Sequence, residues 1–365
     1  MKLQILVPQY KEPFEIIKPL LDSLVVQQNI DFDDLGVIIC KDGEPEVNPY
    51  DVRYNDGDKI STVYHNGRTC DYPFKIEYHI CEHQGVSATR NECLDRATAD
   101  YVMFCDIDDM FMNACGLYII FREINGEGFD TLMSAFVEET RMPEIDKQTN
   151  KPIIDFNTGR PKMDKNTPVY ITHQTDSTFV HGKIHRRKFL INNNIRWNPD
   201  LTIHEDSYFN CLCQRIAGPE NTKYCPQPFY LWKWRDDSVC RHDPDYILKT
   251  YNNMLDSNTA LVKQFEDRNK KDDAKFFVCS MVYDAYYTMN KDEWLKQENQ
   301  DYRTAVEKRF REYYEEFESR FLTVDQDMKN QVIMGIKNRM FGEGLFLESI
   351  TFNDWIKEIK EKYHP

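Results

Sequence analysis

No stretch of about 18 consecutive apolar residues, the length a helix needs to cross a bilayer, occurs in this 365-residue chain. We therefore expect no membrane-spanning helix. The first residues, MKLQILVPQYKE, contain only a short apolar run that meets Pro8 and charged residues at once. This pattern indicates an interior strand and gives no sign of a signal peptide. No internal repeat or low-complexity tract is evident.

A disulfide framework is not indicated either. The chain has 11 cysteines, an odd number, and several lie within apolar segments such as VMFCD and FFVCSMV. This placement is typical of buried, reduced thiols rather than of paired cysteines. We therefore expect a cytoplasmic location, because reduced thiols persist in that compartment.

Positive charge is in deficit, since the formal net charge is -15 at pH 7. A broad nucleic-acid surface and an anionic membrane are therefore disfavoured as partners. The segment HRRK at 185–188 is a candidate for a local basic groove, but a solvated helix face is the favoured interpretation.

The hydrophobic content of 41% is ample for a core, and the length indicates about two domains. The first hundred residues alternate strand-like and helix-like segments, which predicts an α/β fold with a mostly parallel sheet flanked by helices. The predicted strands are 3–7, 35–43, 75–83 and 101–105, and the predicted helices are 14–28 and 87–98. Ligands should lie beyond the carboxyl ends of such strands, where Tyr10, Asp42 and the acidic residues after 105 all fall.

The helical pattern is lost between 140 and 178, which predicts a long hairpin or excursion over the site. After about residue 242 the sequence becomes largely helical. We therefore predict one domain over 1–242 and a helical C-terminal domain over 243–365. One apolar stripe in this helical region indicates core packing, and its members are Phe310, Tyr313, Tyr314, Phe317 and Phe321.

The stretch VMFCDIDDMF at 102–111 sets a buried strand directly against three carboxylates, Asp106, Asp108 and Asp109. Like charges this close repel, and each loses hydration near a core. A divalent cation, substrate hydroxyls or a basic side chain would offset this cost, and carboxylate oxygens favour Mg²⁺, Mn²⁺ or Ca²⁺ over Zn²⁺. An ordinary acidic turn is the alternative.

A second acidic motif, HED at 204–206, precedes the helical pattern of SYFNCLCQRIA. Glu205 and Asp206 are therefore predicted in the first turn of a helix, where its dipole favours carboxylates. A carboxylate at this position is also a candidate general base.

Six short motifs in order resemble the inverting glycosyltransferases of family 2, which have the GT-A fold. They are PQYKE, KDG, GVSATRN, DIDD, HGKIHRRKFL and HED, and they cover about residues 1–240. The chain departs from the family pattern at Lys11, where the family has Asn, and at Lys41-Asp42-Gly43, which has one carboxylate where the family has two.

This resemblance implies a nucleotide-sugar donor, with a UDP-sugar favoured, held by Pro8, Tyr10, Asp42, Arg90 and Asp106. Tyr10 would pack on the base, Asp42 would accept a hydrogen bond from the base, and Asp106 would face the ribose. Arg90 would hold either a phosphate oxygen or a carboxylate of the acidic cluster.

The resemblance also implies a cofactor, Mn²⁺ or Mg²⁺, that Asp108 would bind and that His242 would help to hold. Asp109 would support a neighbouring group or cap a helix. Asp206 would be the general base that deprotonates the acceptor hydroxyl, with Glu205 as the reserve candidate. The acceptor is expected to be a saccharide or another hydroxyl compound, and no stable nucleic-acid partner is favoured.

Other functions fit parts of the sequence. A haloacid-dehalogenase-type phosphatase would use Asp106 as its nucleophile, and an inactive carbohydrate-binding or scaffold protein would keep the fold without turnover. Trp232 and Trp234 alternate on a predicted strand and suit either an acceptor sugar or the core. In HICEH, His79, Cys81 and His83 share one face of a predicted strand, which suits strand burial better than zinc.

Overall fold

The computed structural model describes residues 1–43, 57–59, 62–65, 68–126, 128–154, 161–174, 178–235, 250–291, 294, 300–341 and 350–363. Its internal contacts divide the chain into two compact units. The first comprises Met1–Asp200 and Phe209–Ser238, and the second comprises Leu201–Tyr208 and Val239–Pro365. The first unit is an α/β domain, and the described helices from residue 250 onward belong to the second.

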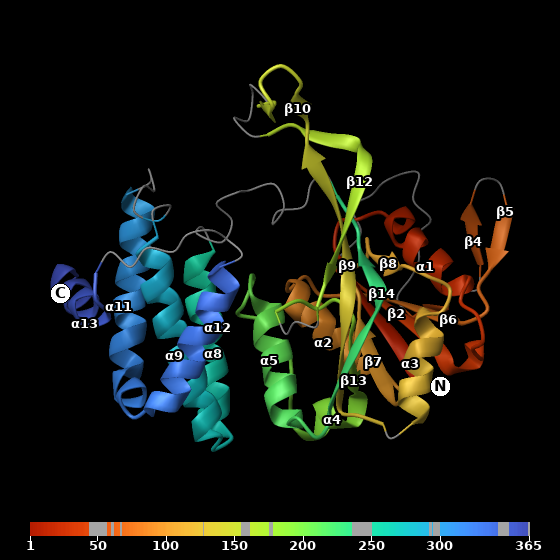
Figure 1. Cartoon of the computed structure of the whole chain (residues 1–365). Coiled ribbons are helices and arrows are strands. Elements are labelled where there is room, and N and C mark those ends of the chain that lie inside the picture. Colours follow the sequence, from red (N-terminus) through yellow and green to blue (C-terminus); the bar gives the residue numbers. More distant parts are fainter. Residues whose placement is uncertain are drawn as a thin grey trace. The chain divides into compact units, whose positions relative to one another are not determined.

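A ten-stranded sheet forms the first unit, in the order β3-β6-β2-β1-β7-β13-β9-β14-β8, with β12 paired to β9 (Figure 1). Strands β6, β2, β1 and β7 run parallel, whereas β13 is antiparallel to both of its neighbours. The α/β prediction is confirmed, and the sheet is mixed beyond β7. The strands are β1 Leu3–Gln9, β2 Leu35–Asp42, β3 Asp58–Lys59, β6 Lys75–Cys81, β7 Tyr101–Phe104, β8 Met110–Phe111, β9 Thr131–Pro143, β12 Met163–His173, β13 Lys183–Arg186 and β14 Thr222–Trp232.

Helices cover both faces of the parallel part of this sheet. Leu3, Ile5 and Val7 of β1 pack in one core cluster with side chains of α1 (Lys18–Val25) and α3 (Gly116–Asn125). On the other face lies α2 (Val86–Arg96), which packs on β1 and β2. Because helices cover both faces of the sheet, the central strands are formed by continuous runs of apolar residues.

The helix predicted over 14–28 is shorter in the structure. A 3₁₀ turn occupies Phe14–Ile17, and α1 begins at Lys18, with Pro19 in its first turn. Proline suits this position because its missing N–H has no partner at a helix start. A further short helix, α4 (Arg187–Asn192), follows β13, and α5 (Glu205–Ala217) precedes β14.

Strands β9 and β12 form a long antiparallel pair that projects from the rest of the sheet (Figure 1). Strand β9 continues to Pro143, and β12 returns beside it, with a register shift between Met163 and Pro168. A small hairpin of β10 (Ile145–Asp146) and β11 (Lys151–Pro152) lies between them. Another hairpin, β4 (Thr62–His65) with β5 (Arg68–Asp71), precedes β6.

Among the described residues of the second unit, five helices from residue 251 onward pack around an aromatic core. They are α8 Tyr251–Asp267, α9 Lys271–Met289, α11 Gln300–Leu322, α12 Gln326–Phe341 and α13 Phe352–Lys362. The predicted stripe of α11 is buried throughout, so its interpretation as core packing is confirmed. The nine cysteines whose side chains the structure describes are free thiols, as predicted. In the part of the chain that is described, no helix has the length and apolar character needed to cross a membrane.

A buried carboxylate ties the last helix to this core. Glu307 of α11 is 5% exposed and accepts hydrogen bonds from Trp294 Nε1 at 3.1 Å, Lys362 Nζ at 2.9 Å and the Tyr363 hydroxyl at 2.5 Å. Burial acts to raise the pKa of Glu307, but these hydrogen bonds outweigh it and lower the pKa below its ordinary value of 4.5.

Replacing Glu307 by Gln should lower the free energy of unfolding by about 1–3 kcal/mol at pH 7, because charge-assisted hydrogen bonds are lost. The folded-state pKa is depressed, so this stabilisation is present above the ordinary pKa and is lost as the pH falls through the folded-state pKa. Urea unfolding at pH 7 and at pH 3 to 4 measures both effects. Glu318→Gln is the matched control, since its pair with Lys360 is half-exposed and should contribute below about 1 kcal/mol. Equal effects of the two variants would contradict the account.

Candidate active site

The carboxyl ends of the parallel strands bring together the side chains that the sequence singled out. Tyr10 follows β1, Asp42 ends β2, and Asp106 follows β7. Gln9 is in register with Lys41, and the amide of Cys105 donates to Leu6 O at 3.0 Å. These strand ends therefore lie at one edge of the sheet, as predicted.

Arg90 is the basic partner of the acidic cluster. It comes from α2, is 4% exposed, and its Nη2 lies 3.0 Å from Asp106 Oδ1. Its guanidinium also packs 4.3 Å from the ring centroid of Trp197. Of the two roles considered for Arg90, the structure shows the one in which it holds an aspartate of the cluster.

Asp109 is the most deeply buried carboxylate of the cluster, at 1% exposure. The Tyr230 hydroxyl donates to its Oδ2 at 2.5 Å, and the amide of Lys233 donates to its Oδ1 at 2.9 Å. Burial raises the pKa of the Asp109 carboxyl well above its ordinary value, and the charges of Asp106 and Asp108 raise it further. A carboxylate in this setting gains from any nearby cation.

One histidine completes a possible metal site. Asp106, Asp109 and His181 each offer one ligand atom, and these atoms all lie within 4.8 Å of one another. Two carboxylate oxygens and an imidazole nitrogen fit Mn²⁺, which accepts both donor types, and suit Mg²⁺ less well because of the nitrogen. The donor set therefore fits the cation implied by the sequence.

Packing holds His181 in place. Its ring stacks on Trp232 at a centroid distance of 4.9 Å and on Tyr230 at 5.1 Å. Gly182 has a φ of +66°, and a Cβ there would lie 2.3 Å from Ser134 Oγ, so this turn requires glycine. His181 lies in the HGKIHRRKFL motif but was not among the predicted site residues, and its position directly before Gly182 was the available signal.

Asp108 has a different partner. Its Oδ2 lies 3.1 Å from Arg235 Nη1, and the same nitrogen is 3.7 Å from Glu12 Oε1. Burial, followed by the charge of Asp106, raises the pKa of Asp108, while Arg235 acts in the opposite direction. Metal binding by Asp108 stays a prediction. His242, its predicted companion, lies outside the described residues.

Asp42 orders the loop between β6 and α2. It is 5% exposed, and its two oxygens accept from His83 Nδ1 at 3.0 Å and from the amides of Gln84 at 2.8 Å and Gly85 at 3.1 Å. Gly85 is the N-cap residue of α2, so the carboxylate serves the positive end of this helix. Tyr10 is 43% exposed, and its ring stacks on that of His83 at 5.0 Å with an interplanar angle of 10°.

Glu205 and Asp206 occupy the first turn of α5, as predicted. His204 precedes them with a φ of +63°, and its Nε2 lies 3.2 Å from Thr250 Oγ1. Its carbonyl accepts from Ser257 Oγ at 2.9 Å. All of these contacts lie within the second unit, and the catalytic role of Asp206 stays a prediction.

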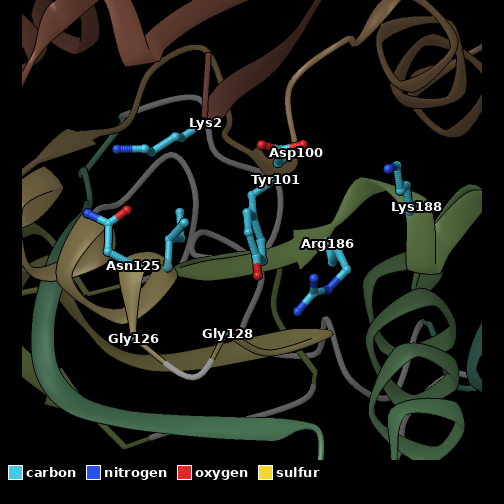
Figure 2. Close-up of a pocket in the computed structure, with 9 residues that line it drawn as sticks. Lys2, Asp100, Tyr101, Asn125, Gly126, Gly128, Arg186 and Lys188 are labelled. Atoms are coloured by element: carbon cyan, nitrogen blue, oxygen red, sulfur yellow. The ribbon is translucent and has the colours of Figure 1, made fainter.

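A separate hollow of about 390 Å³ lies at the opposite ends of the parallel strands (Figure 2). Arg186 and Lys188 of the HRRK segment line it together with Lys2. Lys2 pairs with Asp34 at 2.8 Å and Arg186 with Asp130 at 3.0 Å. Lys2 and Arg186 are therefore already paired, which favours a structural role for Arg186 of the HRRK segment.

Manganese should stabilise the protein through the group of Asp106, Asp109 and His181. At a free concentration of 100 times Kd it would add about 2.7 kcal/mol to the free energy of unfolding. Thermal unfolding with and without MnCl₂ measures this, and His181→Ala should abolish the shift. The control is His173→Ala, because His173 also packs against the ring of Phe136 but pairs with Glu138. If Asp108→Ala removed the shift and His181→Ala kept it, the ion would be held elsewhere.

Comparison with known proteins identifies the fold independently. A family model described as glycosyl transferase family 2 matches residues 4–179. The structure resembles S. aureus TarS 1-349 in complex with UDP, at 12% identity and a TM-score of 0.56, covering 96% of this chain and 94% of that chain. It resembles TarS 1-349 in complex with UDP-GlcNAc at 12% identity and a TM-score of 0.57, covering 95% and 93%.

A longer TarS structure is also similar, at 13% identity and a TM-score of 0.57, covering 100% of this chain and 55% of that chain. A sequence search among curated proteins finds no match. At these identities the structures show a shared fold, whereas the family model rests on the sequence itself. Residues 4–179 therefore match glycosyl transferase family 2, and the structure has the GT-A fold.

Proposed function

We propose that this chain is a metal-dependent inverting glycosyltransferase that moves a hexose from a nucleoside-diphosphate sugar to an acceptor hydroxyl. A saccharide is the favoured acceptor. The observation that carries the proposal is the group of Asp106, Asp109 and His181 at the carboxyl edge of the parallel strands. Ligands of open α/β sheets bind at this edge. The family match favours a transferase over the phosphatase alternative.

A uridine nucleotide is the first donor to test. The two similar TarS structures are complexes with UDP and with UDP-GlcNAc. In the present chain, Pro8 and Tyr10 at the end of β1 would lie against the base, and the carboxylate of Asp106 would lie toward the ribose and diphosphate.

The main contribution of this site would be to stabilise the negative charge that develops on the leaving group in the transition state. A Mn²⁺ or Mg²⁺ ion bound by Asp106, Asp109 and His181 would neutralise the negative charge that develops on the departing diphosphate. Arg90 fixes the orientation of Asp106 through its ion pair. Tyr230 and the amide of Lys233 fix Asp109 in the same way, so the carboxylates are oriented before a substrate arrives.

Asp206 would act as the general base and Glu205 would be its reserve. Removal of a proton from the acceptor hydroxyl would let that oxygen attack the anomeric carbon opposite the departing nucleotide. A single displacement of this kind inverts the configuration. Adjacent residues of a helix point about 100° apart, so one of the two side chains serves this role.

Nucleotide release from UDP-sugars in the presence of Mn²⁺ tests the activity, with GDP-, CMP- and dTDP-sugars as the comparison set. We expect chelation to abolish release and Asp106→Asn to reduce it about 100-fold, because the leaving-group charge loses its support. Hydrolysis of an aryl phosphate by the wild type, lost in Asp106→Asn, would instead support the phosphatase.

The base is tested with paired variants. Asp206→Asn should lower kcat by about 10²–10⁴-fold while leaving the affinity for the donor nucleotide unchanged. Glu205→Gln, one position away in the same helical turn, is the control and should stay near wild type. The opposite result would transfer the role to Glu205, and wild-type turnover by both variants would refute a base in this turn.

A further inference from the structure

A nine-residue sequence repeat occupies the end of the arm that β9 and β12 form (Figure 1), so the expectation of no internal repeat is wrong here. Its three copies are MPEIDKQTN at 142–150, KPIIDFNTG at 151–159 and RPKMDKNTP at 160–168. Each copy has Pro at its second position, Ile or Met at its fourth, Asp at its fifth and Thr at its eighth. The structure describes residues 142–154 and 161–168 of this repeat, which we call the arm tip.

The third residues of the copies close a ring of backbone hydrogen bonds. The amide of Glu144 donates to Lys162 O at 2.7 Å, that of Lys162 to Ile153 O at 2.8 Å, and that of Ile153 to Glu144 O at 2.8 Å. Each copy therefore makes the same contact with another copy, and an approximate three-fold axis relates them. Equivalent side chains of the copies then lie on the same side of the ring.

One side of this ring is apolar. Each copy contributes its Pro and its Ile or Met, and these residues pair between copies: Ile145 with Pro152, Ile154 with Pro161, and Met163 with Pro143. Directly paired residues share a face of a sheet, so these side chains lie on one side of the ring. Ile145 is 46% exposed and Ile154 is 54% exposed, and the prolines paired with them are exposed as well. The arm tip thus has an apolar face that is open to solvent in the described structure.

The carboxylates of the arm tip are engaged, whereas two of its cations are not. Asp146 and Asp164 accept backbone amides within their own turns, and Glu144 forms an ion pair at 2.8 Å. Lys147 and Lys151 are exposed, and neither forms an ion pair with any described residue. The arm tip therefore offers uncompensated positive charge beside its apolar face.

A lipid bilayer suits this face better than a protein partner does. A stable protein interface takes about 20–30 residues on each side, and the apolar face has far fewer. Binding at the boundary between headgroups and acyl chains needs only a small apolar surface with cations beside it. The three prolines have no N–H to desolvate, and the ring satisfies the next amide of each copy. The backbone of the arm tip is therefore also compatible with burial in lipid.

The net charge of -15 does not prevent this contact. Glu138 and Trp232 are the last pair that joins β9 to β14, and β9 continues from there to Pro143. At about 3.3 Å per residue, Pro143 lies roughly 17 Å beyond that pair. This distance exceeds the Debye length of about 8 Å at physiological ionic strength, so repulsion between the remaining sheet and anionic lipid is screened.

We propose that the arm tip docks this chain on an anionic membrane surface. Its apolar face lies in the boundary between headgroups and acyl chains, and Lys147 and Lys151 lie against the lipid phosphates. β9 runs from the arm tip to Phe136, whose ring packs on that of His181 at 5.1 Å. Docking therefore holds the candidate metal site at a fixed distance from the lipid, whatever reaction that site carries out.

Co-sedimentation of the full chain with vesicles of phosphatidylcholine and phosphatidylglycerol in equal parts tests this docking, with vesicles of phosphatidylcholine alone as the comparison. We expect the chain to bind the mixed vesicles and salt to weaken this binding. The double variant Ile145→Ser, Ile154→Ser should reduce partitioning at least about tenfold, because apolar burial is lost. The double variant Lys147→Gln, Lys151→Gln should reduce it about fivefold per lysine, on the mixed vesicles only.

Met334→Ser is the matched control, because Met334 is 65% exposed on α12 of the second unit and should leave partitioning unchanged. Thermal unfolding without vesicles checks that every variant is folded. A wild-type chain that stays in the supernatant, or arm-tip variants that sediment as the wild type does, would refute the docking. Self-association without vesicles that the isoleucine variant abolishes in analytical ultracentrifugation would also overturn it, since the apolar face would then belong to a second copy.

Discussion

Electrostatic repulsion among three carboxylates at one sheet edge is the constraint around which the first unit is organised. Each aspartate has a partner of its own: Asp106 has Arg90, Asp108 has Arg235, and buried Asp109 has Tyr230. Burial and mutual repulsion still raise the pKa of Asp109 well above its ordinary value. Without a cation, the burial and mutual repulsion of these carboxylates raise the free energy of the folded state. A bound cation would relieve this cost, so the site should favour one.

The partners come from elements far apart in the chain, so the site depends on the whole sheet. Arg90 lies on α2, whereas Tyr230 lies on β14, which pairs with β9 in parallel and with β8 antiparallel. His181 precedes β13, the antiparallel strand between β7 and β9. The mixed half of the sheet thus supplies groups that lie beside the carboxyl ends of the parallel strands.

At the end of β2, a single carboxylate, Asp42, also has partners that compensate its burial. Asp42 serves the imidazole of His83 and the first amides of α2, so its charge is used to set the loop in place. Gly43 gives that loop its turn.

The sequence by itself determined the alternation of strands and helices up to residue 105, the strand-end positions of Tyr10, Asp42 and Asp106, and the similarity of residues 4–179 to glycosyl transferase family 2. Apolar periodicity and turn residues depend on neighbouring positions in the chain, so they can be recognised in the sequence alone. Only the tertiary structure decided that His181 joins Asp106 and that His83 covers Tyr10. Such contacts depend on strand order and on packing between residues distant in sequence. Local sequence patterns therefore do not predict them.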